Sequence, residues 1–312
     1  MLLESENGET LAEIVRESMK MSKELYKTSI YAVVSDNASP MIKMGELLSH
    51  IIWHSTCSSH TANLLCKDVL DKNVIEQVTS ILKEFKHTDH EKLLIQKGGK
   101  KVKLPCEVRW CSYRDSFLSS TENLKYMKVI AADENTKKIK ENAISLLFNN
   151  NFVEQVKENI QLIDPICKLI NLCQSSKFSI ADAANLWLHL ELPDNFENKF
   201  KGAIRKRKNM GLNIYALVAY YLHPDYDNND LPREAKQQIN RFFLKHLSSN
   251  GLEELDLFQN NFGIFEISRA KKIGNPILFW NLTEVECPNL AGLAIKLLKI
   301  QRKLVIQYCF GI

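Results

Sequence analysis

Two short groups of residues carry side chains that could bind a metal. Asp36 follows the apolar run Tyr31–Val34 in YAVVSDNASPM, and Cys57 and His60 lie three residues apart in CSSHTANLL. A carboxylate at a strand end suits Mg²⁺, and a Cys and a His on one side of a helical turn are half of a zinc site. The alternatives are an aspartate that caps a helix beginning near Ala38, and a buried cysteine beside a hydrogen-bonded histidine.

A third group combines arginine, tryptophan and lysine, which are side chains that bind nucleic acids. Arg109 and Trp110 stand in EVRWCSYRDSF, shortly after KGGKKVK, which contains Lys100, Lys101 and Lys103. An indole beside a guanidinium can stack on an unpaired base, while lysines contact the phosphates. The alternative is a tryptophan that anchors the start of a helical domain.

The overall composition is that of a packed globular protein. The 312 residues are 45% hydrophobic and the net charge is only +4, so any surface that attracts DNA must be local. The run KFKGAIRKRK at 199–208 is a second basic candidate, either for phosphate contact or as a nuclear import signal. A solvated helix face explains the same run equally well.

The cysteines and the apolar runs indicate where the protein works. Several of the eight cysteines lie inside apolar runs with no signal peptide before them, which predicts a reduced protein inside the cell. No apolar stretch approaches the roughly 20 residues that cross a bilayer. We therefore expect no membrane partner, and a location in the nucleus, or in the cytoplasm if the protein is not imported.

The hydrophobic pattern predicts the elements that position these residues. It favours a helix from about residue 9, a strand at 29–34, a helix at 38–50 and a short strand at 51–53, which together form a fragment of an α/β layer. From about residue 59 helices dominate. The glycines, lysines and proline of 98–105 interrupt them and mark a candidate domain boundary.

The rest of the chain reads as a helical bundle or array. Ile75, Val78, Leu82 and Phe85 mark one amphipathic helix, and similar faces recur between about 112 and 270. Further helices are predicted with these apolar residues: Phe152, Val156, Ile160 and Ile163; the run 214–222, stopped by Pro224; Ile239, Phe242, Phe243 and Leu247; and Leu290, Leu293, Ala294, Leu297 and Leu298.

The order of the motifs resembles that of the hAT-superfamily DNA transposases. SDNASPM is followed by C-x-x-H-x-x-N-L-L, VRWCS, LHPDY and PNLAGLAIKLLKI, over about residues 8–300. The resemblance implies an α-rich α+β fold, in which a ribonuclease H-like α/β core is interrupted by a large all-helical insertion domain. It assigns 1–105 to a truncated core, 106–270 to the insertion, and 271–312 to a return to the core with part of a C-terminal dimerisation region.

The resemblance also implies roles for single residues. Asp36 aligns with the second of three acids that bind Mg²⁺ or Mn²⁺, and Cys57 and His60 align with the family's C-x-x-H motif. Arg109 and Trp110 look like the R-W motif, whose tryptophan assists with a flipped base at the cleaved DNA end. Paired metals perform the phosphodiester cleavage and strand transfer of such enzymes.

Several expected features of the family are missing. No strand carrying the first acid precedes the helix near residue 9, Gln301 and Arg302 stand where a Glu-Arg pair is expected, and Pro40 replaces a common asparagine. A zinc-finger module of the BED kind is absent too. We therefore expect a catalytically inactive remnant in which Asp36 binds a metal weakly or not at all.

Three functional hypotheses follow. The leading one is a transposase-derived remnant that retains DNA binding, through Arg109, Trp110 and the nearby lysines, or dimerisation with another copy or a related chain. The second is an incomplete gene model of an active transposase, with its missing acids encoded in flanking exons. The third is an interaction scaffold with no DNA role, using the apolar helices at 214–222 and 288–299.

Overall fold

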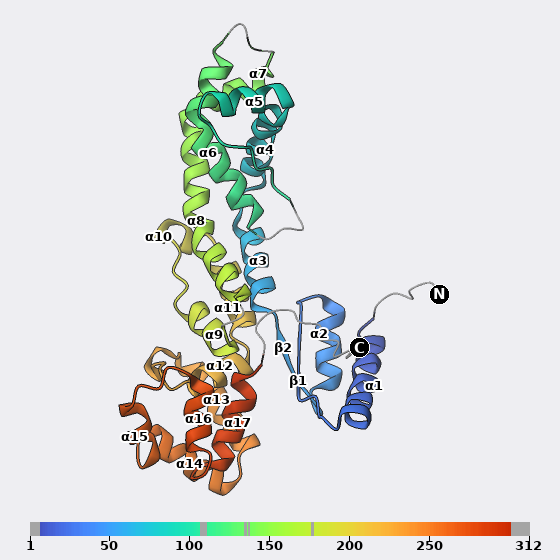
Figure 1. The fold of residues 1–312 in the computed structure, drawn as a ribbon, viewed down its shortest axis with the longest axis vertical. Coiled ribbons are helices and arrows are strands. Elements are labelled where there is room, and N and C mark those ends of the chain that lie inside the picture. Colours follow the sequence, from blue (N-terminus) through green and yellow to red (C-terminus); the bar gives the residue numbers. More distant parts are fainter. Residues whose placement is uncertain (1–6, 107–110, 134–135, 137, 176–177, 301–312) are drawn as a thin grey trace. The chain divides into compact units, whose positions relative to one another are not determined.

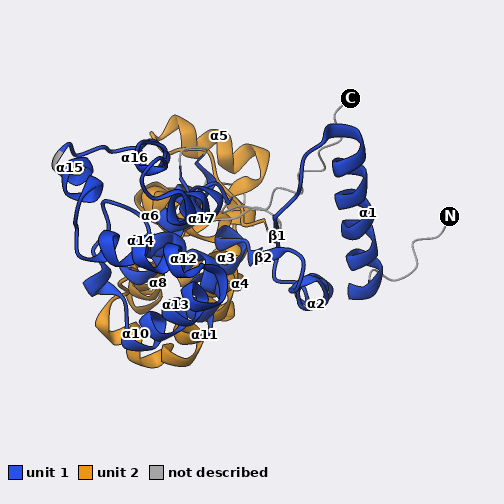
Figure 2. Cartoon of the chain, turned by 90° about the horizontal axis from the view of Figure 1, so that it is seen from below, with its two compact units in different colours: residues 1–61, 172–189, 206–312 blue, residues 62–171, 190–205 orange. Residues whose placement is uncertain are grey.

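The computed structural model describes residues 7–106, 111–133, 136, 138–175 and 178–300. These residues are mostly helical, which confirms the α-rich part of the predicted fold class (Figure 1). The chain forms two compact units: unit 1 comprises 1–61, 172–189 and 206–312, and unit 2 comprises 62–171 and 190–205 (Figure 2). The domain boundaries expected after residues 105 and 270 do not coincide with the limits of these units, and they stay a prediction.

In chain order, the elements are α1 (Gly8–Tyr26), β1 (Ala32–Ser35), α2 (Ser39–Leu48), β2 (Trp53–Thr56), α3 (Ser58–Val69), α4 (Lys72–Lys86), α5 (Thr88–Gln96), α6 (Ser112–Ala131), α7 (Glu141–Phe148), α8 (Asn150–Gln174), α9 (Ile180–Leu188), α10 (Asp194–Lys199), α11 (Lys201–Gly211), α12 (Ile214–Tyr221), the 3₁₀ turn η1 (Asn228–Asp230), α13 (Arg233–His246), α14 (Ser249–Gln259), α15 (Ile264–Ala270), α16 (Pro276–Thr283) and α17 (Pro288–Leu298). None of the helices in the described part of the chain is both long and apolar enough to cross a membrane.

Unit 1 contains a small parallel sheet with helices on both faces. β1 and β2 pair in parallel, in register from Ala32 opposite Trp53 to the ends of both strands. Val33 packs against the cluster formed by α1 and α2, whereas Ala32 and Val34 pack into the larger core of α9 and α12–α17. Because successive side chains of a strand point to opposite faces, the two strands lie between two helical layers. A parallel α/β layer is therefore present, and its identification with part of a ribonuclease H-like core remains a proposal.

The second strand is displaced from its predicted position. The apolar run Ile51–Trp53 predicts a strand, but the N–H groups of Ile51 and Ile52 both donate to the carbonyl of Leu48, at 2.9 and 3.0 Å, and close the end of α2. Ile52 is buried beside Leu48, and the strand itself is Trp53–Thr56. The apolar character of 51 and 52 reflects burial at a helix end and not strand pairing.

The apolar helices of unit 1 form its own core. α17 buries Leu290, Leu293, Ala294, Leu297 and Leu298, and α12 buries all its residues from Ala216 to Tyr220. The core also contains the fully buried Trp280 and Phe243. The helices predicted at 214–222 and 288–299 therefore exist, and most of their apolar residues face the core of unit 1.

The regular elements in the described residues of unit 2 are all helices. α4 packs against α5, α6 and α7 and buries Val74, Val78, Ile81, Leu82 and Phe85, close to the predicted face. α8 likewise buries Phe152, Val156 and Ile163, whereas Ile160 is half-buried. Local periodicity therefore identified both faces correctly within one or two positions.

Candidate functional site

The parallel pairing brings the two motifs of the sequence to one end of the sheet. Asp36 follows β1 directly, and Cys57 and His60 follow β2. The N–H of Cys57 donates to the carbonyl of Ser35 at 2.8 Å, which extends the pairing by one residue beyond the strands. The sequence order alone does not show this proximity, because it depends on the strands being parallel and in register.

The carboxylate of Asp36 contacts the backbone at the start of α2. Its Oδ1 accepts a hydrogen bond from the N–H of Ala38, the N-cap residue of α2, at 2.9 Å. This is an Asx turn, in which a short acid stabilises the turn that leads into a helix. Cys57 is fully buried and His60 half-buried.

These residues do not fit the two-metal site that the family resemblance implies. Among the described residues, no group of three or more His, Cys, Asp or Glu side chains is arranged to hold a metal ion. At this end of the sheet Asp36 contributes one carboxylate, and its Oδ1 already bonds the backbone. A two-metal cleavage centre needs several oxygen ligands around each ion.

A buried serine, Ser35, contacts a half-buried histidine, His54, on the neighbouring strand. Ser35 Oγ is 2.7 Å from His54 Nε2 and also donates to the carbonyl of Asp36 at 3.0 Å. The hydroxyl has one proton, so the histidine tautomer decides whether Ser35 or His54 is the donor of the 2.7 Å contact. Burial lowers the pKa of His54, which favours the neutral ring. The pair is a structural link between β1 and β2.

The least expected feature of unit 2 is a polar stripe buried along α6. Its members are small or amide side chains at helical spacing, and all are at most 5% exposed: Ser112, Ser116, Ser119, Ser120 and Asn123. Buried polar groups need partners, so such a stripe must contact something other than an apolar helix face. The sequence reasoning missed it because it followed apolar periodicity only. The spacing of serines in SYRDSFLSSTEN was the available signal.

The stripe binds the backbone of an extended segment, residues 99–106, which we call the strap. The strap contains the lysines that the sequence picks out as candidate DNA ligands. Every third N–H of the strap donates to a side chain of α6: that of Lys100 to Asn123 Oδ1 at 2.7 Å, that of Lys103 to Ser119 Oγ at 3.0 Å, and that of Cys106 to Ser112 Oγ at 3.0 Å.

The three lysines of the strap differ in their surroundings. All are exposed, but Lys100 Nζ pairs with Glu122 at 2.9 Å. Lys101 lies near Glu91, whose pKa is lowered chiefly by its hydrogen bond to Lys86 and further by the charge of Lys101. Lys103 has no ion-pair partner among the described residues. Lys103 is therefore the lysine of this group most available to an external anion.

The other DNA ligands predicted from the sequence are Arg109, Trp110 and the basic run 199–208. Arg109 and Trp110 lie outside the described residues, although Cys106 and Cys111 on either side are described. The second basic run is helical, and its Lys199 lies over the ring of Phe200 at 5.1 Å. It remains a candidate for phosphate contact or nuclear import, as the sequence alone predicted.

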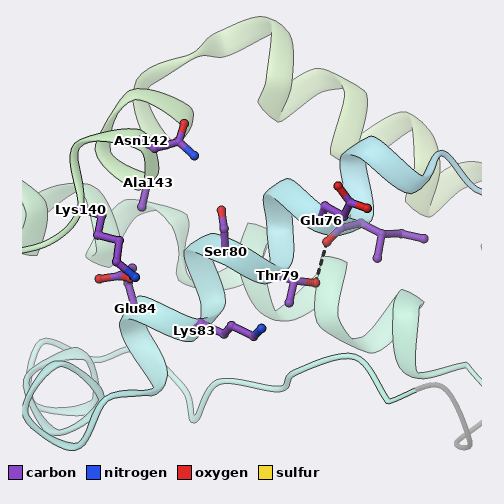
Figure 3. Close-up of a pocket in the computed structure, with 9 residues that line it drawn as sticks. Glu76, Thr79, Ser80, Lys83, Glu84, Lys140, Asn142 and Ala143 are labelled. Atoms are coloured by element: carbon purple, nitrogen blue, oxygen red, sulfur yellow. Dashed lines mark hydrogen bonds and ion pairs between the residues drawn. The ribbon is translucent and has the colours of Figure 1, made fainter.

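A groove of about 310 Å³ lies between α4 and α7 in unit 2 (Figure 3). Its polar groups are largely engaged: Lys140 pairs with Glu84 at 2.8 Å, and the hydroxyl of Thr79 donates to the carbonyl of Ile75 at 2.6 Å. Ser80 likewise donates to a backbone carbonyl of its own helix. Because the Lys140–Glu84 pair and both hydroxyls are already engaged, these groups offer little that would select a ligand.

The LHPDY motif at 222–226 has a structural role in unit 1. The carbonyl of Leu222 accepts a hydrogen bond from Trp280 Nε1 at 2.8 Å, and the ring of His223 stacks on that of Tyr226 at 4.0 Å between centroids. Tyr226 donates to Asp182, which also accepts from Ser179 at the start of α9. Burial and the bond to Asp182 raise the pKa of Tyr226. These contacts fix the turn after α12 to α9 and α16.

Comparison with known proteins adds no family to these observations. No protein-family model matches the chain, and no curated protein matches its sequence. The relation to the hAT transposases therefore rests on the resemblance of the motifs, and the function that follows from it is a proposal.

Proposed function

We propose that this chain is a transposase-derived protein that binds DNA without cleaving it, and that the strap is its DNA contact. The observation that carries the proposal is the fixed backbone of the strap, which three side chains of α6 hold while the lysine side chains stay exposed. A backbone that is ordered before binding loses less conformational entropy when it meets the phosphates.

The charges around the strap imply weak binding that depends strongly on salt. Each lysine that neutralises a phosphate contributes about one unit to the slope of log affinity against log salt. Glu122 and Glu91 offset part of the charge of Lys100 and Lys101. We therefore expect Lys103 to contribute most and Lys100 least.

We propose that the protein does not cleave DNA because the carboxylate of Asp36 has a structural role. This carboxylate is bonded to the start of α2. The motif resemblance supplies the transposase ancestry, and the surviving acid is then a remnant with a structural task. Dimerisation, which the same resemblance implies, is a separate property and is not needed for DNA binding through the strap.

The test is DNA binding by the purified chain, measured by fluorescence anisotropy with duplex and hairpin DNA over a range of salt concentrations. Lys101→Ala/Lys103→Ala should weaken binding and lower the salt slope by about 2. The matched control Lys20→Ala/Lys23→Ala removes two exposed lysines from α1 and should leave both unchanged.

A charge-neutralising variant tests the ranking of the lysines. Glu122→Gln removes the partner of Lys100 and should strengthen DNA binding, because the freed ammonium can meet a phosphate. Undetectable binding at low salt, or binding unaffected by the strap variants, would refute the proposal. DNA nicking that needs Mg²⁺ or Mn²⁺ and is lost in Asp36→Ala would instead support an active transposase.

A further inference from the structure

Three cysteine thiols from three different helices of unit 2 lie together. Cys66 belongs to α3, Cys167 belongs to α8, and Cys111 is the N-cap residue of α6. The thiol of Cys167 is hydrogen-bonded with the thiols of both Cys111 and Cys66. We call these three residues the thiol cluster. Segments far apart in the sequence therefore meet through sulfur atoms at one place in the unit.

The position of Cys111 brings its side chain against α8. Its backbone has a φ of 61°, in the left-handed region that residues other than glycine rarely occupy. The side chain makes no capping hydrogen bond to α6. Its Sγ lies 3.9 Å from the carbonyl oxygen of Cys167 and 3.9 Å from Oδ1 of Asn171. Residues 167 and 171 are one helical turn apart, so Cys111 lies against the face of α8 that carries both.

The three thiols differ in their access to solvent. Cys167 is 1% exposed and Cys66 is 5% exposed, whereas Cys111 is half-buried. An oxidant in solution therefore meets Cys111 before the other two. The next thiol in contact with Cys111 is that of Cys167.

The surroundings keep the cluster protonated at neutral pH. The hydrogen bond with Cys167 and burial raise the pKa of Cys111. The hydrogen bond with Cys111 lowers the pKa of Cys167, but the bond with Cys66 and burial outweigh it, so this pKa is raised as well. Two protonated thiols in contact are stable until an oxidant arrives, because the thiolate is the reactive form.

Arg114 supplies the positive charge that a thiolate needs. Its guanidinium acts on the pKa of both Cys111 and Cys167 and lowers each of them. Its Nε is buried and has no hydrogen-bond partner among the described residues. The same guanidinium contacts Asp115 and Asp164 only at 3.4 Å. A negative charge formed at the cluster is therefore partly stabilised by a neighbouring cation.

We propose that the thiol cluster is a site of reversible oxidation, at which a peroxide joins Cys111 to Cys167 in a disulfide. In the first step the Cys111 sulfur attacks one oxygen of hydrogen peroxide. The O–O bond breaks, a sulfenic acid forms, and the departing hydroxide takes the thiol proton and leaves as water. In the second step the Cys167 sulfur attacks that of the sulfenic acid. The S–O bond breaks, the S–S bond forms, and a second water leaves.

Contact between the two thiols favours the disulfide over further oxidation. The reaction consumes two thiols and one peroxide and yields one disulfide and two waters. A thiol that already touches the sulfenic acid attacks it at a high effective concentration. The bond would connect the start of α6 to α8 across 56 positions of sequence. This inference does not rest on DNA binding, and its tests are made without DNA.

The first test locates the bond in the purified full chain. The reduced protein is treated with hydrogen peroxide at neutral pH, the remaining thiols are alkylated with N-ethylmaleimide, and the peptides are identified by mass spectrometry. We expect a Cys111–Cys167 disulfide that dithiothreitol reduces. A main product that joins Cys111 to Cys106, or Cys167 to Cys66, would overturn the proposal. So would a sulfinic acid at Cys111 with Cys167 still a thiol.

The second test compares matched variants. Cys111→Ser should lose the disulfide and leave Cys167 open to alkylation after unfolding. Cys106→Ser removes an exposed thiol outside the cluster and should form the disulfide as the wild type does. Loss of the bond in Cys106→Ser would contradict the proposal.

A third measurement keeps the proposal falsifiable if Cys111→Ser fails to fold. The wild-type chain is oxidised both folded and in urea. In the folded chain most of Cys167 should be bonded to Cys111. In urea Cys167 should be distributed among several of the other seven cysteines, because only the fold brings residues 111 and 167 into contact. The same distribution of partners in both conditions would overturn the proposal.

Discussion

Oδ1 of Asp36 accepts a hydrogen bond from the N–H of Ala38 at 2.9 Å, so the acid at the end of β1 supports the start of α2. A single hydrogen bond of this kind contributes about 1 kcal/mol to stability. Asp36→Ala should lower the free energy of unfolding by this amount in urea titrations, and Asp36→Asn should retain most of it. If Mg²⁺ raised the unfolding midpoint of the wild type but not that of Asp36→Ala, the result would show that Asp36 binds a metal ion and would contradict a purely structural role in the turn.

The strap offers a prediction at the level of single amides. Asn123 is 1% exposed, and its Oδ1 holds the N–H of Lys100, whereas Ser119 holds that of Lys103. Asn123→Ala should accelerate hydrogen exchange mainly at Lys100, and Ser119→Ala mainly at Lys103. Each should lower the free energy of unfolding by about 1 kcal/mol, because one part-buried hydrogen bond is lost. Equal acceleration at both amides would show that the strap opens as a whole.

Two helical glycines should respond in opposite directions to alanine. A Cβ at Gly45 would lie 1.9 Å from Nδ1 of His54, whereas nothing lies within 4 Å of a Cβ at Gly292. Gly45→Ala should destabilise by about 1–3 kcal/mol through overpacking. Gly292→Ala should stabilise by up to about 1 kcal/mol through helix propensity. Thermal unfolding of both variants measures the contrast, and destabilisation by Gly292→Ala would contradict it.

Stability should fall in mild acid. Burial lowers the pKa values of His54, His223 and His246 from 6.5. The unfolded chain therefore binds protons before the folded chain does, and stability present above about pH 6.5 is lost as the pH falls toward the lowered values. Urea unfolding from neutral pH to pH 5 should show this loss, and His54→Gln should reduce it. A flat profile would show that the three rings are not protected from protonation.

Much of the secondary structure could be predicted from the sequence. Val78, Leu82 and Phe85 are buried as their spacing predicts, and the strand before Asp36 exists, although it begins at Ala32 and not at residue 29. Less of the candidate site could be predicted from the sequence. The lysines are evident in the sequence, but the serine and asparagine stripe that holds their backbone is not, because its side chains are polar and their burial depends on a partner from another segment.

The sequence by itself determined which helices form and which of their faces avoid water, because periodicity and capping act between residues a few positions apart. The tertiary structure alone decided what covers each face. It turned the apolar residues of α17 inward, left Ile14, Met21 and Leu25 of α1 exposed, and brought Asp36 beside Cys57. The physical reason is that the hydrophobic effect is not directional. Any neighbour that excludes water stabilises an apolar side chain, and only the packing of the whole unit selects which neighbour it contacts.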